Sequence, residues 1–200
     1  MEAVLQPIKP RSTRSTTFKN NLLPFQRSIE REDSLIMAKQ DFHSKSFKEG
    51  IEILTDEINL AIHWQRPSIL LAIHKSKPEQ IKAQKALEKE IIKWDQKVKL
   101  IKATGKTDVI DAICKTKNHN EIVFFVSELG IVGGQVNGTI FSALNMHREL
   151  LVEQSIRVVF WLTELESESL PHLAPDFWAF RHRVVEFSAS RGTKKAAQHG

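Results

Sequence analysis

The chain has 200 residues, of which 41% are hydrophobic and 26% charged, and its formal net charge at pH 7 is +5. This length is enough for one α/β domain with a core and a tail, and it excludes two ordinary domains. No apolar run approaches the roughly 20 residues of a membrane-spanning helix, and no signal-peptide pattern begins the chain. We therefore expect a soluble, cytoplasmic protein with no membrane partner.

Residues 1–45 contain three prolines, a Ser/Thr cluster and scattered basic residues, without helical or strand periodicity. This composition predicts a basic, largely disordered tail, or a segment that becomes ordered on a partner. Arg11 and Arg14 lie beside serines and could contact phosphates, but no aromatic stacking pattern supports a specific nucleic-acid site.

Helical periodicity begins at Phe47, and apolar residues at intervals of three or four predict a helix that ends before Pro67. A strand is predicted at Ile69–Ile73. A second helix begins near Pro78, because proline is tolerated in the first turn of a helix. A stripe of apolar residues, Ala83, Leu87, Ile91 and Trp94, gives that helix its inner face. The next strand is predicted at Val98–Ile101.

After a break at Gly105, Asp108 is predicted to cap a short helix through Cys114. Cys114 is the only cysteine, so it excludes an intramolecular disulfide, and its apolar setting indicates a buried structural thiol. The strand Ile122–Val126 is apolar at every position, which is typical of a central parallel strand covered on both faces. Four glycines then predict a flexible loop: Gly130, Gly133, Gly134 and Gly138.

The last part of the domain is predicted to hold a helix over residues 139–154 and a strand at Val158–Leu162. A short helix near residues 174–181, capped by Asp176, leads into a final strand at Val184–Phe187.

Strands that alternate with helices imply right-handed crossovers and a mainly parallel sheet. We therefore predict a single three-layer α/β/α domain over residues 46–188 with five strands, followed by a flexible C-terminal tail at residues 189–200.

The turn after the first strand is His74-Lys75-Ser76-Lys77-Pro78, where a phosphate-binding loop would have glycines before its Lys-Ser pair. Lys75-Ser76 matches the end of that motif, but no glycine precedes it in the loop, and Pro78 removes an N–H donor. We interpret the segment as a basic strand-to-helix turn and predict no nucleotide cofactor. Lys75 and Ser76 remain nucleotide-binding candidates under the alternative discussed below.

Glu128 follows the third strand, where a nucleotide-hydrolysing enzyme places an acidic metal ligand or a water-polarising carboxylate. Without a phosphate cradle, this single glutamate is better explained as an anchor of its loop, and it joins Lys75 and Ser76 only under the nucleotide alternative. The histidines have no metal-ligand spacing, and Cys114 lacks an identifiable base. We predict no metal site, no catalytic residue and no enzymatic activity.

The densest aromatic cluster lies in residues 174–181. Phe177 and Phe180 are assigned to the core. Trp178 and Arg181 are candidate partner-binding residues, because Trp and Arg are over-represented as anchors in protein interfaces.

Four segments resemble a known bacterial family: Ala143–Leu151, Arg157–Glu164, Pro175–Arg181 and Val184–Phe187. Over residues 50–188 the chain resembles the N-terminal α/β domain of large tetratricopeptide-repeat proteins related to the STAND group of signal-transducing NTPases. The resemblance implies a P-loop-like core of strand order 5-1-4-3-2, here as a stand-alone domain with a degenerate Walker A site. Ile69–Ile73, Ile122–Glu128 and Val158–Glu164 would be the Walker A, Walker B and sensor strands.

The leading functional hypothesis is a non-catalytic module that binds a protein partner. The resemblance suggests an accessory or adaptor role in bacterial signalling or antiviral defence. Two alternatives stay open. One is a nucleotide-binding or hydrolysing STAND-like domain, and the other is salt-sensitive nucleic-acid binding through the basic surface.

Overall fold

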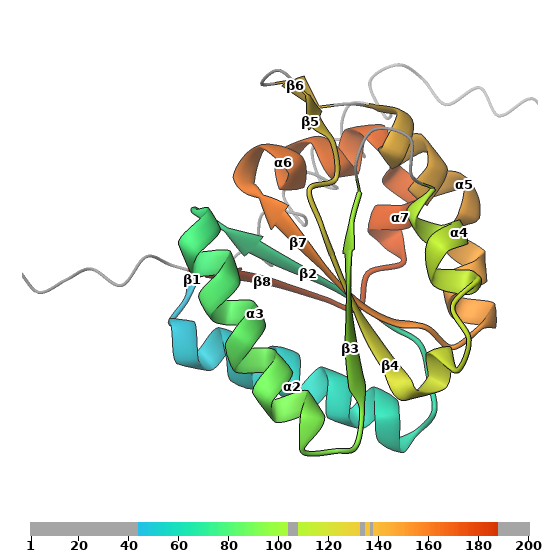
Figure 1. Ribbon diagram of the computed structural model, residues 1–200. Helices are drawn as coiled ribbons and strands as arrows, with labels where there is room; N and C mark the ends of the chain where they lie inside the picture. Colours follow the sequence, from blue (N-terminus) through green and yellow to red (C-terminus); the bar gives the residue numbers. More distant parts are fainter. Residues whose placement is uncertain (1–43, 104–107, 133–134, 137, 188–200) are drawn as a thin grey trace, which may run out of the picture. The chain divides into compact units, whose positions relative to one another are not determined.

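A computed structural model describes residues 44–103, 108–132, 135–136 and 138–187 (Figure 1). All of them belong to one compact unit of the chain. The predicted C-terminal tail and nearly all of the predicted N-terminal tail lie outside the described residues, as do Gly105, Gly133 and Gly134.

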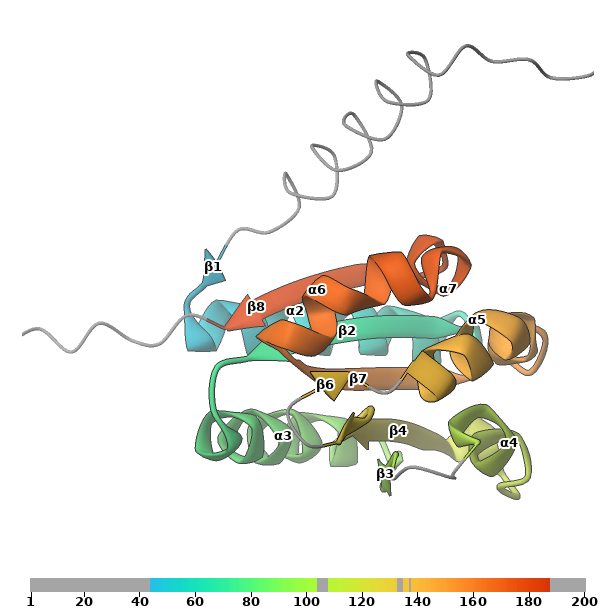
Figure 2. The ribbon, with the colours of Figure 1, turned by 90° about the horizontal axis from the view of Figure 1, so that it is seen from above.

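The centre of the domain is a parallel sheet of six strands in the order β1-β8-β2-β7-β4-β3. The strands are β1 Ser44–Lys45, β2 Ser68–His74, β3 Lys97–Lys102, β4 Ile122–Ser127, β7 Arg157–Thr163 and β8 Arg183–Phe187. Apart from the short β1, this is the predicted set of five strands in the predicted order 5-1-4-3-2. Figure 2 shows β8, β2, β7, β4 and β3 in that sequence.

Within the part of the chain that the structure describes, six α-helices cover the two faces of the sheet: α2 Phe47–His63, α3 Lys77–Ile92, α4 Val109–Cys114, α5 Gly138–Glu153, α6 Glu164–Leu173 and α7 Pro175–Ala179. Alternate residues of each central strand enter two separate cores. Leu70, Val159 and their neighbours pack against α2 and α3, whereas Ile69 and Val158 pack against α4 to α7. The predicted three-layer α/β/α architecture is therefore confirmed (Figure 1).

The ends of the elements differ from prediction because polar residues also belong to them. Ser68, His74 and Thr163 extend their strands beyond the apolar runs, since ladder hydrogen bonds form between backbone groups and continue through polar residues. Lys45, which was assigned to the tail, belongs to β1 and aligns with Phe187 of β8. Trp94 lies beyond the end of α3 instead of within it.

Besides β1, four of the described elements were not predicted. The helix α6 has a weak apolar pattern and contains Pro171, yet Thr163 and Glu166 form a capping box at its start. The expected glycine loop contains a two-stranded antiparallel pair, β5 Ile131–Val132 and β6 Gln135–Val136. Residues His119–Glu121 form a 3-10 helix in the turn that precedes β4.

Gly50 allows α2 to lie close to the end of the sheet. A Cβ atom at this position would lie 2.7 Å from Cε1 of Phe187 on β8. Because Phe187 is buried and also contacts Phe47 and Trp161, its ring has little freedom to move away.

Candidate functional site

The carboxyl ends of β2, β4 and β7 meet at one edge of the sheet, which is where open α/β folds bind their ligands. The turn after β2 brings Lys75 and Ser76 to this edge, and Glu128 follows β4 there. The three nucleotide-binding candidates from the sequence therefore share one edge. Glu164, the first residue of α6 after β7, joins them.

The first turn of α3 is capped by its own side chains. Ser76 has an extended backbone, and its hydroxyl accepts a hydrogen bond from the Glu79 backbone N–H at 3.4 Å. In return, Oε2 of Glu79 accepts a hydrogen bond from the Lys75 backbone N–H at 2.8 Å. A phosphate at a helix N-terminus uses backbone N–H groups of this kind and a favourable helix dipole. Here a carboxylate of the chain already occupies that environment.

The lysines of the turn are also paired with carboxylates. Nζ of Lys77 lies 2.8 Å from Oε1 of Glu128, and Nζ of Lys102 lies 3.5 Å from the same oxygen. Nζ of Lys75 lies 3.7 Å from Oε1 of Glu164. Exposed ion pairs of this kind each stabilise a fold by about 0.2–1 kcal/mol. These carboxylates also partly neutralise the positive charge at the carboxyl ends of the strands.

Glu128 has an unusual backbone as well as two cationic neighbours. Its φ of 62° lies in the left-handed region, which is uncommon for a residue other than glycine. The hydrogen bond from Lys77 lowers the pKa of Glu128, and Lys102 acts in the same direction. Glu128 is therefore held as a carboxylate that anchors the turn after β2 to the end of β4.

His74 lies at the end of β2, directly before the turn. Its side chain is 6% exposed, and its Nδ1 has no hydrogen-bond partner among the described residues. Burial lowers the pKa of His74, and the nearby charge of Lys77 lowers it further. The imidazole is therefore neutral at physiological pH and adds no positive charge to the edge.

Glu166 is a buried carboxyl group that was not singled out from the sequence. It is 2% exposed, and its Oε2 accepts hydrogen bonds from the backbone N–H of Thr163 at 2.8 Å and from the Thr163 hydroxyl at 2.9 Å. Burial raises the pKa of Glu166, although these hydrogen bonds and one from the Leu129 backbone oppose the shift. The Thr-x-x-Glu spacing after the predicted strand is the signal that could have located it.

The predicted partner-binding pair lies away from this edge, at the end of α7. Trp178 is only 8% exposed and belongs to the core. The guanidinium of Arg181 lies 3.9 Å from the centroid of the Trp178 ring, and its Nη1 donates to the Trp178 carbonyl oxygen at 2.7 Å. Arg181 thus covers the tryptophan. Partner binding by the two residues stays a prediction.

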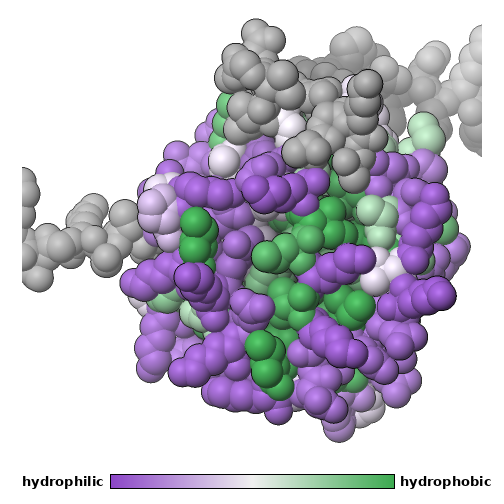
Figure 3. All heavy atoms as spheres, in the orientation of Figure 1, coloured by the Kyte–Doolittle hydropathy of each residue, from purple (hydrophilic) through white to green (hydrophobic). Residues whose placement is uncertain are grey.

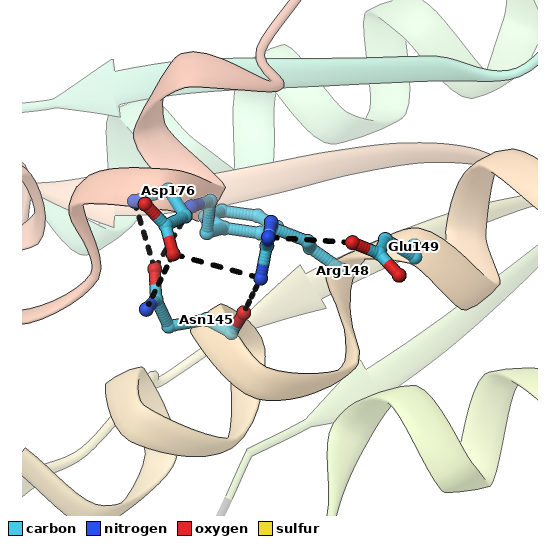
Figure 4. Close-up of polar contacts among 5 residues, drawn as sticks. Asn145, Arg148, Glu149 and Asp176 are labelled. Carbon is cyan, nitrogen blue, oxygen red and sulfur yellow. Dashed lines mark hydrogen bonds and ion pairs between the residues drawn. The ribbon is translucent and has the colours of Figure 1, made fainter. Parts of the chain in front are cut away.

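Asp176 does not cap α7 as predicted. The N-cap position is Ala174, which has no side-chain acceptor. Instead, Oδ1 of Asn145 on α5 accepts hydrogen bonds from the backbone N–H groups of Asp176 at 2.9 Å and Phe177 at 3.0 Å (Figure 4). Arg148 of the same helix donates to the Asn145 carbonyl oxygen, and its Nη1 lies 3.7 Å from Oδ2 of Asp176. The cap is therefore supplied by a different helix.

Metal binding and thiol chemistry concern other side chains of the described residues. No group of three or more His, Cys, Asp or Glu side chains among them is placed to hold a metal ion. Cys114 is partly buried on α4, and burial together with Asp111 and Asp108 raises the pKa of its thiol. A raised pKa disfavours the thiolate, which is the nucleophilic form.

No family model and no curated protein matches this sequence. Solved structures with a similar fold include chains of the Drosophila ORC. In the structure of ORC bound to AT-rich DNA and Cdc6, one chain is 10% identical with a TM-score of 0.50, and the match covers 94% of this chain and 38% of that one. In the structure of ORC bound to DNA, the identity is 12% and the TM-score 0.49, with 92% and 37% covered.

At this level of identity the likeness concerns the fold alone, and this chain spans less than two thirds of the ORC chains that it matches. Together with the strand order, it defines a P-loop NTPase-like α/β fold. Among the helices that the structure describes, none combines the length and hydropathy needed to cross a bilayer.

Proposed function

We propose that this P-loop-like domain is a non-catalytic protein-binding module that acts in the cytoplasm. The main support is a hydrogen bond at the α3 N-terminus, which the Glu79 carboxylate accepts from the Lys75 backbone N–H. A nucleotide phosphate would have to displace this carboxylate and would meet the negative charge of Glu128 and Glu164 nearby. A fold that keeps its sheet but fills its phosphate position is suited to presenting surfaces.

The resemblance to STAND-related tetratricopeptide-repeat proteins gives this proposal its biological setting. On that basis we propose an accessory or adaptor role in bacterial signalling or antiviral defence. In this proposal the protein partner is recognised by the exterior of the domain.

Nucleotide binding is the second candidate, and one observation favours it. Lys75, Ser76 and Glu128 lie together at the carboxyl edge of the sheet, although they are far apart in the sequence. The pairs Lys77–Glu128 and Lys75–Glu164 are exposed and exchange easily with solvent ions. A nucleotide with a bound magnesium ion could compete for these lysines.

Isothermal titration of the protein with ATP and magnesium separates the two candidates. The proposal predicts no saturable binding heat for the wild-type protein. Saturable binding that is lost in Lys75→Ala would contradict it and favour the nucleotide-binding alternative. Glu79→Gln is a useful companion, because it removes the carboxylate charge from the helix N-terminus while keeping an acceptor oxygen. A gain of affinity in this variant would identify Glu79 as the group that excludes phosphate.

A further inference from the structure

Among the described residues, β3 is the outermost strand on its side of the sheet and pairs with β4 alone. Its outer side is a lateral edge of the sheet, distinct from the edge formed by the carboxyl ends of the strands. The Ala103 backbone N–H donates to the Ser127 carbonyl oxygen at 2.8 Å, and Lys102 aligns with Ser127. Backbone groups alternate in direction along a strand, so Lys99 and Ile101 also bond toward β4. The N–H and C=O groups of the intervening residues, Val98, Leu100 and Lys102, face away from the sheet.

An apolar surface lies beside these outward backbone groups. Leu100 is 66% exposed at the middle of β3, between lysines on both sides. Figure 3 shows apolar side chains gathered over the region where β3 faces the viewer in Figure 1, with hydrophilic side chains around them. An edge strand with an exposed leucine and unpaired backbone groups is a template for a further strand.

The charge of this edge is positive and only partly compensated. Nζ of Lys97 lies 3.2 Å from Oε2 of Glu121. Lys102 shares Glu128 with Lys77, which is the closer of the two lysines. Lys99 contacts the neutral hydroxyl of Thr116 at 2.9 Å. The three lysines of β3 are therefore only partly neutralised. Glu121 pairs with Lys97, and Glu128 is divided between Lys102 and Lys77.

We propose that the outer edge of β3 binds an extended acidic segment of a protein partner, which adds to the sheet as a further strand. The inference rests on the proposed protein-binding function and assigns a surface to it. In this mode, main-chain hydrogen bonds to Val98, Leu100 and Lys102 give affinity, and side chains give specificity. Acidic residues of the segment pair with the lysines of β3, and an apolar residue covers Leu100.

A second copy of this chain is a poor occupant of the edge. Pairing β3 with β3 of another copy would bring rows of lysines together, and like charges on neighbouring strands are destabilising. Nucleic acid would satisfy the lysines but would leave Leu100 and the outward pattern of N–H and C=O groups without complementary partners. A peptide strand matches all three features.

The test uses the full chain and a displayed library of random twelve-residue peptides. We expect the selected peptides to combine acidic and apolar residues in alternation. Leu100→Pro removes one outward N–H, and proline is tolerated where an edge-strand N–H faces solvent. It should weaken binding of the selected peptides about tenfold or more. Met146→Ser is the control, because Met146 is 72% exposed on α5, against 66% for Leu100, and its substitution should leave the affinity unchanged.

Leu100→Ser removes the apolar side chain without adding a charge, and it provides a second variant in case proline disturbs folding, which thermal unfolding of each variant reveals. Hydrogen exchange gives an independent readout. Bound peptide should slow the exchange of the Val98, Leu100 and Lys102 amides, whereas the amides of Lys99 and Ile101 are already protected in the free protein.

The edge assignment is overturned if no peptide is selected, if selected peptides bind both Leu100 variants with unchanged affinity, or if they protect amides elsewhere. Binding of a single-stranded DNA 20-mer that protects these same amides would overturn it in favour of nucleic acid. Peptides that bind a different face would leave the proposed protein-binding function standing. Saturable ATP binding, in contrast, would count against the proposed protein-binding function and would not test the assignment of the peptide site to β3.

Discussion

Asn145 performs the role of an N-cap for a helix to which it does not belong. Its Oδ1 accepts the N–H groups of the second and third residues of α7, which are the groups that an N-cap side chain normally satisfies. These two residues, Asp176 and Phe177, connect α7 to α5, and Phe177 is buried against Phe160. One amide side chain therefore fixes the position of the last helix.

Asn145→Ala should lower the free energy of unfolding by about 1–2 kcal/mol, because two N–H groups lose their acceptor. Urea unfolding followed by tryptophan fluorescence measures this change. Met146→Ala is the matched control, since the neighbouring Met146 side chain is 72% exposed and should contribute little. Equal stability of the two variants would show that solvent replaces the Asn145 cap without cost.

Glu166 should give the stability of the protein a specific pH dependence. Its pKa in the folded state is raised by burial above the ordinary value of a glutamate, about 4.3. Between these two values the folded state binds more protons than the unfolded chain. The contribution of Glu166 to the free energy of unfolding is therefore fully present below about pH 4.3 and is lost as the pH rises through its folded pKa.

Comparing urea unfolding of the wild-type protein and Glu166→Gln over this pH range isolates the effect of Glu166. Relative to the wild-type protein, the variant should gain stability as the pH rises, because glutamine carries no titrating proton. A difference between the two proteins that stays constant with pH would contradict a raised pKa at Glu166.

At the scale of elements, the packing of α2 on the sheet depends on Gly50. Glycine within a helix normally costs about 1 kcal/mol relative to alanine, so Gly50→Ala would stabilise α2 if space allowed. The added Cβ would instead lie 2.7 Å from Cε1 of the buried Phe187. We expect a net loss of about 1–3 kcal/mol, as is typical of overpacked cores.

Gly138→Ala is the comparison for Gly50→Ala. An added Cβ at Gly138, the first residue of α5, meets nothing within 4 Å. Thermal unfolding should therefore give an unchanged or higher midpoint for Gly138→Ala and a lower one for Gly50→Ala. A similar midpoint for both variants would mean that α2 can move away from β8 at little cost.

The burial of an element decided whether the sequence could predict it. The central strands β2, β4 and β7 were predictable because strands covered on both faces are nearly continuous apolar runs. The helix α6 escaped prediction because its buried residues are Glu166, Ser167 and Leu170, so the sequence lacks a continuous apolar stripe. The cap of α7 could not be found locally, because Asn145 lies 31 residues before Asp176.

At the scale of the whole molecule, the sheet brings together residues whose roles depend on their neighbours. Lys75, Ser76 and Glu128 were recognisable as candidates, since each follows a predicted strand at the ligand-binding edge. The sequence did not reveal that Glu79 turns back onto the Lys75 N–H, or that Glu164 lies within reach of the Lys75 ammonium. Because of those contacts, the backbone N–H and the ammonium of Lys75 are both paired with carboxylates of the protein itself.

The Glu79 carboxylate accepts the Lys75 backbone N–H at the α3 N-terminus, and we propose that no nucleotide binds there. An NMR titration with ATP and magnesium, observed at the backbone amides of Lys75, Ser76 and Lys77, tests it most directly. These N–H groups would contact a phosphate at this helix N-terminus. We expect their resonances not to move as the nucleotide is added. Saturable shifts of the three amides would contradict it.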